Sequence, residues 1–106
     1  MPGIKPPFDV GMEGAGTVVK AGKKAGVEVG TFVLTGQRGA FTEYQRAKAK
    51  GLFPLPKEDK NFIPIFSSGL TAIISLNEVG EMKSGQTILV TAAAGATGLW
   101  GKTFGI

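Results

Sequence analysis

The sequence contains neither cysteine nor histidine. Without thiols no disulfide framework can form, and without thiolates or imidazoles the usual zinc sites lack their ligands. Nucleophilic catalysis by a Ser-His or Cys-His pair is excluded within this chain for the same reason. We therefore predict that the chain holds no metal.

Aromatic platforms and arginine clusters are also scarce. The chain has one Trp and one Tyr, and its lysines are scattered, although the formal net charge is +4. A nucleic-acid interface needs a clustered basic patch with aromatic side chains for base stacking. The excess of positive charge therefore indicates a solvated surface, and we expect no nucleic-acid partner.

Long apolar runs are the third absence. No run reaches the roughly 18 to 20 apolar residues of a membrane span. Residues 1–7 lack the apolar core of a signal peptide. We expect no membrane association and a soluble intracellular protein.

Glycine is the abundant residue, at 17 of 106. Its positions between β-branched runs predict short strands joined by tight bends. Strands are expected over residues 17–19, 27–34 and 40–46, followed by an extended segment over 52–56. The run 40–46 alternates apolar and polar side chains, which predicts a half-buried strand.

The composition changes at residues 57–60, which read Lys-Glu-Asp-Lys. Beyond this charged hinge, apolar residues recur at the three- and four-residue spacing of an amphipathic helix that ends at Gly80. These apolar residues are Phe62, Phe66, Leu70, Ile73 and Leu76. Ser67, Thr71 and Ser75 form a polar stripe on the opposite face. From periodicity alone, their hydroxyls are expected to bond backbone carbonyls or to face solvent.

The run Thr87–Thr91 is continuously apolar and β-branched, which predicts a strand buried on both faces of a parallel sheet. An A-x-G-x-x-G turn follows it, and a helix is expected from Leu99 onward. Such a turn directs free backbone N–H groups toward one point, where a dinucleotide's pyrophosphate fits. Gly95 would let the backbone approach the phosphates, and Gly98 would let the helix pack closely. The candidate cofactor-binding residues are Ala93, Gly95, Ala96, Thr97 and Gly98.

A second pattern overlaps this turn. Residues 96–103 match a loose phosphate-loop motif, in which Lys102 would reach the β- and γ-phosphates and Thr103 would hold magnesium. The bulky Trp100 and the distance of the pattern from the strand end disfavour this interpretation. It stays open as a lesser alternative to the dinucleotide turn.

Four segments together resemble the medium-chain dehydrogenase/reductase superfamily, in its zinc-free quinone-oxidoreductase branch. They are residues 7–18, 39–44, 68–72 and 85–98, in the order and at the spacing of the family. The resemblance implies an α/β plus β fold. Residues 1–56 would form part of a GroES-like β-barrel substrate domain. Residues 57–106 would form the crossing helix and the first strand, turn and helix of a Rossmann domain.

The resemblance also implies a reaction. Such enzymes use NADPH to reduce the C=C bond of an α,β-unsaturated ketone, such as a 15-oxo-prostaglandin, or a quinone. The residue that matches Thr71 lies beside the nicotinamide, which makes Thr71 a candidate catalytic residue. Zinc-dependent relatives carry His where Met12 stands, and Met is a poor substitute for imidazole on zinc. No zinc is therefore expected. The family also implies a possible homo-oligomer in the cytoplasm, mitochondrion or peroxisome.

Two functional expectations remain open for a chain of 106 residues. The first is an oxidoreductase, or a piece of one, that has lost the first barrel strands and the ribose-reading strand. The second is a truncated, non-catalytic form that is inert or that pairs with a full-length subunit.

Overall fold

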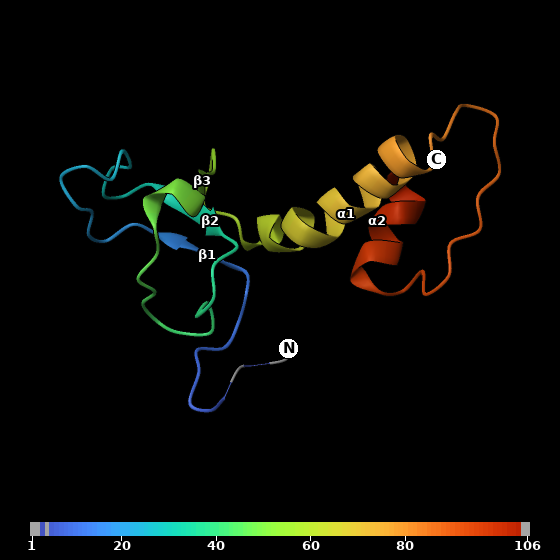
Figure 1. Ribbon diagram of the computed structural model, residues 1–106. Helices are drawn as coiled ribbons and strands as arrows, with labels where there is room; N and C mark the ends of the chain where they lie inside the picture. Colours follow the sequence, from blue (N-terminus) through green and yellow to red (C-terminus); the bar gives the residue numbers. More distant parts are fainter. Residues whose placement is uncertain (1–2, 4, 105–106) are drawn as a thin grey trace. The chain divides into compact units, whose positions relative to one another are not determined.

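The computed structural model describes residue 3 and residues 5–104. The chain divides into two compact units, Met1–Ile63 and Pro64–Ile106, which we call the N-terminal and C-terminal units. The short strands belong to the first unit and the two α-helices to the second (Figure 1). The first predicted domain starts at residue 1 and the second ends at residue 106. Residues 1–2, 4 and 105–106 lie outside the described residues.

The N-terminal unit is built on a three-stranded antiparallel sheet. Its strands are β1 (Gly14–Thr17), β2 (Phe32–Thr35) and β3 (Leu52–Pro54), in the order β1-β2-β3. The central strand supplies the core, because Val33 is 7% exposed and Leu34 2%. Among the described residues β1 and β3 are not paired with each other, so the predicted barrel is not closed.

The strand predictions over 17–19, 27–34 and 52–56 each find a strand nearby, with shifted bounds. The second is much shorter than expected because Gly30 has a φ of +93°, a left-handed conformation that ends an extended run. The Gly30 N–H donates to the Val18 carbonyl at 2.8 Å, which closes the turn that leads into β2.

The prediction of a half-buried strand over residues 40–46 is wrong. This segment forms a series of bends, and the side chains of Phe41 and Tyr44 are 76% and 75% exposed. A short contact with the chain before β1 remains, since the Phe41 N–H donates to the Val10 carbonyl at 3.1 Å. Alternation alone does not make a strand when no neighbouring strand lies along the rest of the segment.

Two glutamine side chains hold this segment in place of a strand ladder. Gln37 accepts from the Lys48 N–H at 2.8 Å through Oε1 and donates to the Lys48 carbonyl at 2.9 Å through Nε2. Gln45 Nε2 donates to the carbonyls of Gln37 and Arg38 at 3.0 and 2.8 Å. The amides therefore replace the backbone partners that a strand would supply.

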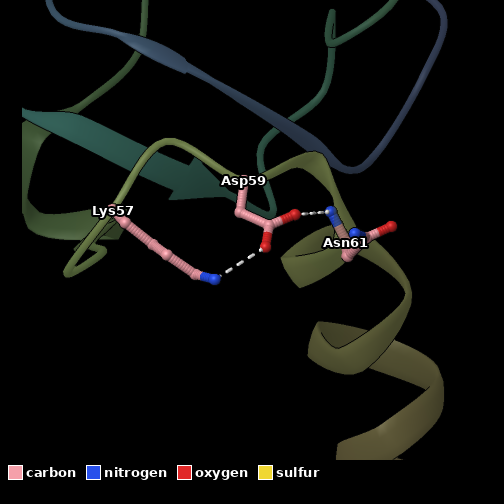
Figure 2. Close-up of polar contacts among 3 residues, drawn as sticks. All are labelled: Lys57, Asp59 and Asn61. Atoms are coloured by element: carbon pink, nitrogen blue, oxygen red, sulfur yellow. Dashed lines mark hydrogen bonds and ion pairs between the residues drawn. The ribbon is translucent and has the colours of Figure 1, made fainter.

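A capped turn at residues 57–61 starts the helical part of the chain. The Asp59 carboxylate accepts from the Asn61 N–H at 2.9 Å and lies 3.2 Å from the Lys57 ammonium (Figure 2). Asp59 is thus the N-cap of the 3-10 helix Lys60–Phe62. The hydrogen bond from Asn61, and then the nearby Lys57, hold the pKa of Asp59 below its usual value.

The predicted helix forms, with π-helical turns at Ile65–Gly69 and Ser75–Val79 on either side of α1 (Leu70–Ile74). Its buried face differs from the predicted one. Gly69 and Ala72 are buried, whereas Leu70 and Ile73 of the predicted apolar stripe are 52% and 37% exposed. The small residues are buried because helix α2 approaches the helix at Gly69.

The helix ends as predicted, with Gly80 at its C-cap. Glu81, the residue after this C-cap, has a left-handed backbone conformation with a φ of +46°. The N–H groups of Gly80 and Met82 donate to the carbonyls of Ser75 and Leu76, at 2.8 and 2.9 Å, and satisfy the last turn.

The helical run Lys60–Val79 bears on the membrane expectation. It has 20 residues and a mean hydropathy of 1.4, so by length and composition it could cross a membrane. It is not an unbroken apolar run, because Ser67, Asn77 and Glu78 lie within it, and the expectation of no membrane association stays a prediction. A single helix of this kind is weak evidence, because core helices of soluble proteins have the same length and composition.

The buried strand predicted at Thr87–Thr91 is absent from the described chain. The connection between the long helix and α2 (Ala96–Phe104) carries no strand (Figure 1). Leu89, within this connection, is 91% exposed. A strand in the interior of a parallel sheet needs a neighbouring strand on each side to satisfy its backbone. No other strand of the C-terminal unit is present among the described residues to pair with this segment.

Candidate nucleotide-binding turn

The predicted phosphate-holding turn forms without its strand. The chain turns at residues 91–94, and α2 begins at Ala96. The Gly95 N–H donates to the Ala92 carbonyl at 2.9 Å, and the Leu99 N–H donates to the Gly95 carbonyl at 2.8 Å. These two bonds join the turn directly to the first turn of the helix.

The N-terminus of α2 has the geometry of an anion site. The N–H groups of residues 96–98 precede the first helical bond, and no backbone hydrogen bond joins them to another described residue. Ala96 and Thr97 are exposed and small, so no large side chain covers these groups. Free N–H groups and the helix dipole favour a negatively charged ligand there.

Gly98 is required by the packing of the turn. A Cβ at this position would lie 2.9 Å from the Ala92 carbonyl carbon and 2.9 Å from the Ala93 Cα. These are backbone atoms, which cannot move aside as a flexible side chain can. Gly98 therefore lets the first turn of α2 lie directly on the turn that precedes it.

Gly95 is less constrained than Gly98. Its Cβ would meet only the Ala92 carbonyl oxygen, at 3.2 Å. Ala92 itself has a φ of +49°, an uncommon conformation for a residue with a side chain. The tight turn thus depends on the close approach at Gly98 and on a left-handed alanine.

Trp100 fixes α2 against the long helix, a role that the sequence did not indicate. Its indole lies 3.7 Å from the position of a Cβ on Gly69, and its Nε1 donates to the Pro64 carbonyl at 3.1 Å. Its ring stacks on Phe104 with centroids 5.4 Å apart. The one available signal was a Trp four residues before a Phe in a helix, which brings the two rings onto one face.

Thr71, the candidate catalytic residue, lies on α1 and is exposed. Helix α1 packs against α2, the helix that follows the turn. Among the hydrogen bonds of the described residues, none joins Thr71 to the turn. Its role beside a nicotinamide stays a prediction.

The phosphate-loop alternative is not supported by this geometry. The pattern at residues 96–103 lies wholly inside α2, so its residues form no loop around a phosphate. Lys102 comes about 1.7 helical turns after Ala96, away from the free N–H groups. The Thr103 hydroxyl donates to the Leu99 carbonyl at 2.8 Å and is not directed to a metal.

The family's zinc position lies in the N-terminal unit. Met12 is 50% exposed, and Glu13 next to it has a buried Oε1 without a hydrogen-bond partner among the described residues. No cluster of three or more acidic residues that could hold a metal occurs in the described part of the chain. The expectation of no zinc continues to rest on the residue types.

Comparison with known proteins identifies the family. The model described as the alcohol dehydrogenase GroES-like domain matches residues 1–57. Mouse prostaglandin reductase-3 is 43% identical over 99 residues, which cover 92% of this chain and 26% of that relative. A probable quinone oxidoreductase of Leishmania amazonensis is 46% identical over 96 residues, covering 90% of this chain and 28% of that relative.

A bacterial relative extends the match. A quinone oxidoreductase of Pseudomonas aeruginosa is 34% identical over 114 aligned residues, covering 99% of this chain and 34% of that relative. The chain thus spans 26–34% of the length of these three relatives. The chain belongs to the medium-chain dehydrogenase/reductase superfamily, in its quinone-oxidoreductase-like branch, and residues 1–57 match its GroES-like domain.

Proposed function

We propose that the chain carries part of an NADPH-dependent oxidoreductase that reduces the C=C bond of α,β-unsaturated ketones, such as 15-oxo-prostaglandins, or reduces quinones. The observation that carries the proposal is the identity of 43% to a prostaglandin reductase and 46% to a quinone oxidoreductase, over 92% and 90% of the chain. The first relative is named as a prostaglandin reductase and the second as a probable quinone oxidoreductase.

The turn before α2 is the proposed cofactor-binding element. The free N–H groups of Ala96, Thr97 and Gly98 would donate to pyrophosphate oxygens. Gly95 and Ala93 would let the backbone approach those oxygens, because neither has a bulky side chain. NADPH, when bound, supplies the hydride. The first turn of α2 would only hold and orient it.

Thr71 is the proposed contact with the nicotinamide end of the cofactor. Thr71 is an exposed residue of α1, and α1 packs against α2. A hydroxyl there could donate or accept one hydrogen bond and so fix the orientation of the ring.

The proposed domain organisation follows the family. Residues 1–56 would belong to the substrate domain, and residues 57–106 would provide the crossing helix and the beginning of the Rossmann domain. The GroES-like match over residues 1–57 supports the first of these assignments. The turn and helix at residues 91–104 support the second.

Titration of the purified chain with NADPH, followed by nicotinamide fluorescence, tests the cofactor proposal. We expect saturable binding with a Kd below about 1 mM, or about −4 kcal/mol. Ala96→Asp should abolish it, because a carboxylate at the start of α2 repels phosphate while it stabilises the helix dipole. Asn77→Asp adds the same charge on the exposed long helix and should leave binding unchanged. Equal binding by both variants would place the ligand elsewhere.

A non-catalytic role is the second candidate, and the small core favours it. Only Val33, Leu34 and Ala72 are buried hydrophobic residues in the described part of the chain. A chain with so little buried apolar area has a weak scaffold for a catalytic site. Folded chain that fails to bind NADPH at millimolar concentration would support this candidate, and sub-millimolar binding would overturn it.

A further inference from the structure

The indole of Trp100 contacts the long helix at two points. Its Nε1 donates to the Pro64 carbonyl at 3.1 Å. Its Cδ2 and Cε2 atoms lie 3.7 Å from the position of a Cβ on Gly69, which is an ordinary packing distance. The packing contact sets the separation of α2 from the long helix. The hydrogen bond is directional, so it also sets the rotation of α2 about its own axis.

The two contact points lie at the ends of a π-helical turn. Pro64 is the N-cap of the π-helical turn Ile65–Gly69, and Gly69 is its last residue. The Leu70 N–H donates to the Ile65 carbonyl, five residues earlier, which is the bond that defines a π turn. Turns of this kind are rare and are frequent at functional sites. The indole of Trp100 therefore spans this turn from its start to its end.

The π-helical turn determines the direction of Thr71. Thr71 is the second residue after the turn, within α1. A π turn takes up about one residue more than an α turn, so a change to α geometry would rotate the residues that follow by about 100°. The direction of the Thr71 side chain relative to α2 thus depends on the turn that Trp100 spans.

We propose that Trp100 is a positioning residue for the cofactor, which holds the π-helical turn and so sets the distance and angle between Thr71 and the phosphate-binding turn before α2. The inference rests on the proposed function and deepens it. Helix α2 carries Trp100 together with the free N–H groups of residues 96–98. The contact of Trp100 therefore joins the phosphate end of the proposed site to its nicotinamide end, and Trp100 acts through Thr71.

Phe104 fixes the indole on α2. The two rings stack with centroids 5.4 Å apart and an angle of 21° between their planes. They are four residues apart in one helix, which places them on the same face. A stacked ring has fewer rotamers available, so the Nε1–H stays directed at the Pro64 carbonyl. A side chain locked in this way is suited to hold a binding element in position.

Inorganic pyrophosphate and NADPH distinguish positioning from general stability. Pyrophosphate needs the free N–H groups at the start of α2, whereas NADPH should contact both this turn and Thr71. Trp100→Phe keeps an aromatic ring over Gly69 but removes the N–H. It should weaken NADPH binding about threefold to tenfold, the net worth of one hydrogen bond, and leave pyrophosphate binding unchanged. Tyr44→Phe removes one ring donor from the N-terminal unit and is the matched control, which should change neither affinity.

A double-mutant cycle with Thr71 shows whether Trp100 acts through it. Thr71→Ala should weaken NADPH binding in the native chain and have less effect in the Trp100→Phe variant, because a misplaced hydroxyl contributes little. A residue that only stabilised the unit would weaken both ligands together. Additive effects on NADPH, or an equal loss for the two ligands, would overturn the proposal.

The native chain separates a failure of this inference from a failure of the proposed function. If the native chain binds both ligands and Trp100→Phe binds NADPH equally well, the positioning role is refuted and the cofactor site stands. If the native chain binds neither ligand, the cofactor site is refuted and the positioning role falls with it.

The indole N–H gives a second test, which decides if Trp100→Phe does not fold. Because the chain has one Trp, its Nε1 proton gives one NMR signal. NADPH should slow the exchange of this proton with solvent, because a ligand that favours the bridged arrangement stabilises it in return. Pyrophosphate should leave the exchange unchanged. An equal exchange rate with and without bound NADPH would overturn the proposal.

Discussion

The two units of the chain differ in whether their elements find partners within it. In the N-terminal unit, every strand pairs with another, and the central strand places Val33 and Leu34 in a small core. In the C-terminal unit, the helices pack through Trp100 against Gly69, while Leu89 in the predicted strand is 91% exposed. The same kind of apolar sequence is thus buried in one unit and solvated in the other.

The difference follows from the hydrogen bonding of the two kinds of element. A helix satisfies its backbone from its own next turn, so the long helix and α2 form wherever their sequences permit. A strand depends on a neighbour, and β2 has two of them. Apolar periodicity therefore predicts a helix more directly than it predicts a strand.

The core of the N-terminal unit gives the largest expected effect. Leu34 is 2% exposed in the central strand, so Leu34→Ala should lower the free energy of unfolding by about 2–5 kcal/mol. The loss combines the transfer of the side chain to water with the cavity that remains. Urea unfolding followed by circular dichroism measures it.

Leu89→Ala is the matched control in the C-terminal unit. The substitution is identical, but Leu89 is 91% exposed, and the change should stay within about 0.5 kcal/mol. If both substitutions cost the same, Leu89 is buried in solution, and the contrast between the units does not hold.

The turn before α2 gives the next effect. Gly98→Ala would place a Cβ 2.9 Å from backbone atoms of Ala92 and Ala93, so the helix must move. We expect a loss of about 1–3 kcal/mol in the stability of the C-terminal unit and weaker NADPH binding. Gly22→Ala is the control, because nothing lies within 4 Å of a Cβ there. Equal stability of the two variants would show that the close approach at Gly98 does not exist.

The fold could be predicted from the sequence where local rules decide. The helix after residue 60, its end at Gly80 and the extended segment that becomes β3 follow from periodicity, capping and proline. The strands at 40–46 and 87–91 could not be predicted correctly, because alternation and β-branching do not reveal whether a neighbour is present. The burial of Gly69 depends on Trp100, 31 positions later, and no local pattern reports it.

The candidate site divides in the same way. The turn was predictable from the small residues at 93–98, since the close approach at Gly98 is a local property. The helix was expected from Leu99 onward, but α2 begins at Ala96, so the predicted start was three residues late. Thr71 entered only through the resemblance to the reductase family. From periodicity, its hydroxyl was expected to bond a backbone carbonyl or to face solvent, and Thr71 is an exposed residue of α1.

Hydrogen bonds from glutamine side chains to the backbone should give a smaller difference in stability between the units. Gln37 bonds both backbone groups of Lys48, 11 residues away, at 2.9 and 2.8 Å. Gln37→Ala should therefore cost about 1–2 kcal/mol, since two hydrogen bonds to the backbone are lost. Faster amide exchange at Lys48 should accompany the loss.

Gln86→Ala is the matched control for this bridge. Gln86 accepts only from the Lys83 N–H, at 2.6 Å and three residues away, so its removal should cost about half as much or less. An equal cost would mean that long-range bridges do not stabilise the N-terminal unit more than local ones.

The smallest effect concerns the cap at residue 59, which is exposed to solvent and salt. The Asn61 N–H and then Lys57 lower the pKa of Asp59 in the folded chain. A lowered folded-state pKa stabilises the fold above the unfolded-state value of about 3.9. This stabilisation is lost as the pH falls through the lowered folded-state pKa.

Asp59→Asn keeps an acceptor for the Asn61 N–H but removes the charge, so it should flatten the dependence of stability on pH between about 2 and 5. Lys57→Met should flatten it less, because the Asn61 hydrogen bond is the larger cause of the shift. Urea unfolding at a series of pH values separates the two variants, and equal flattening would assign the shift to the ion pair instead.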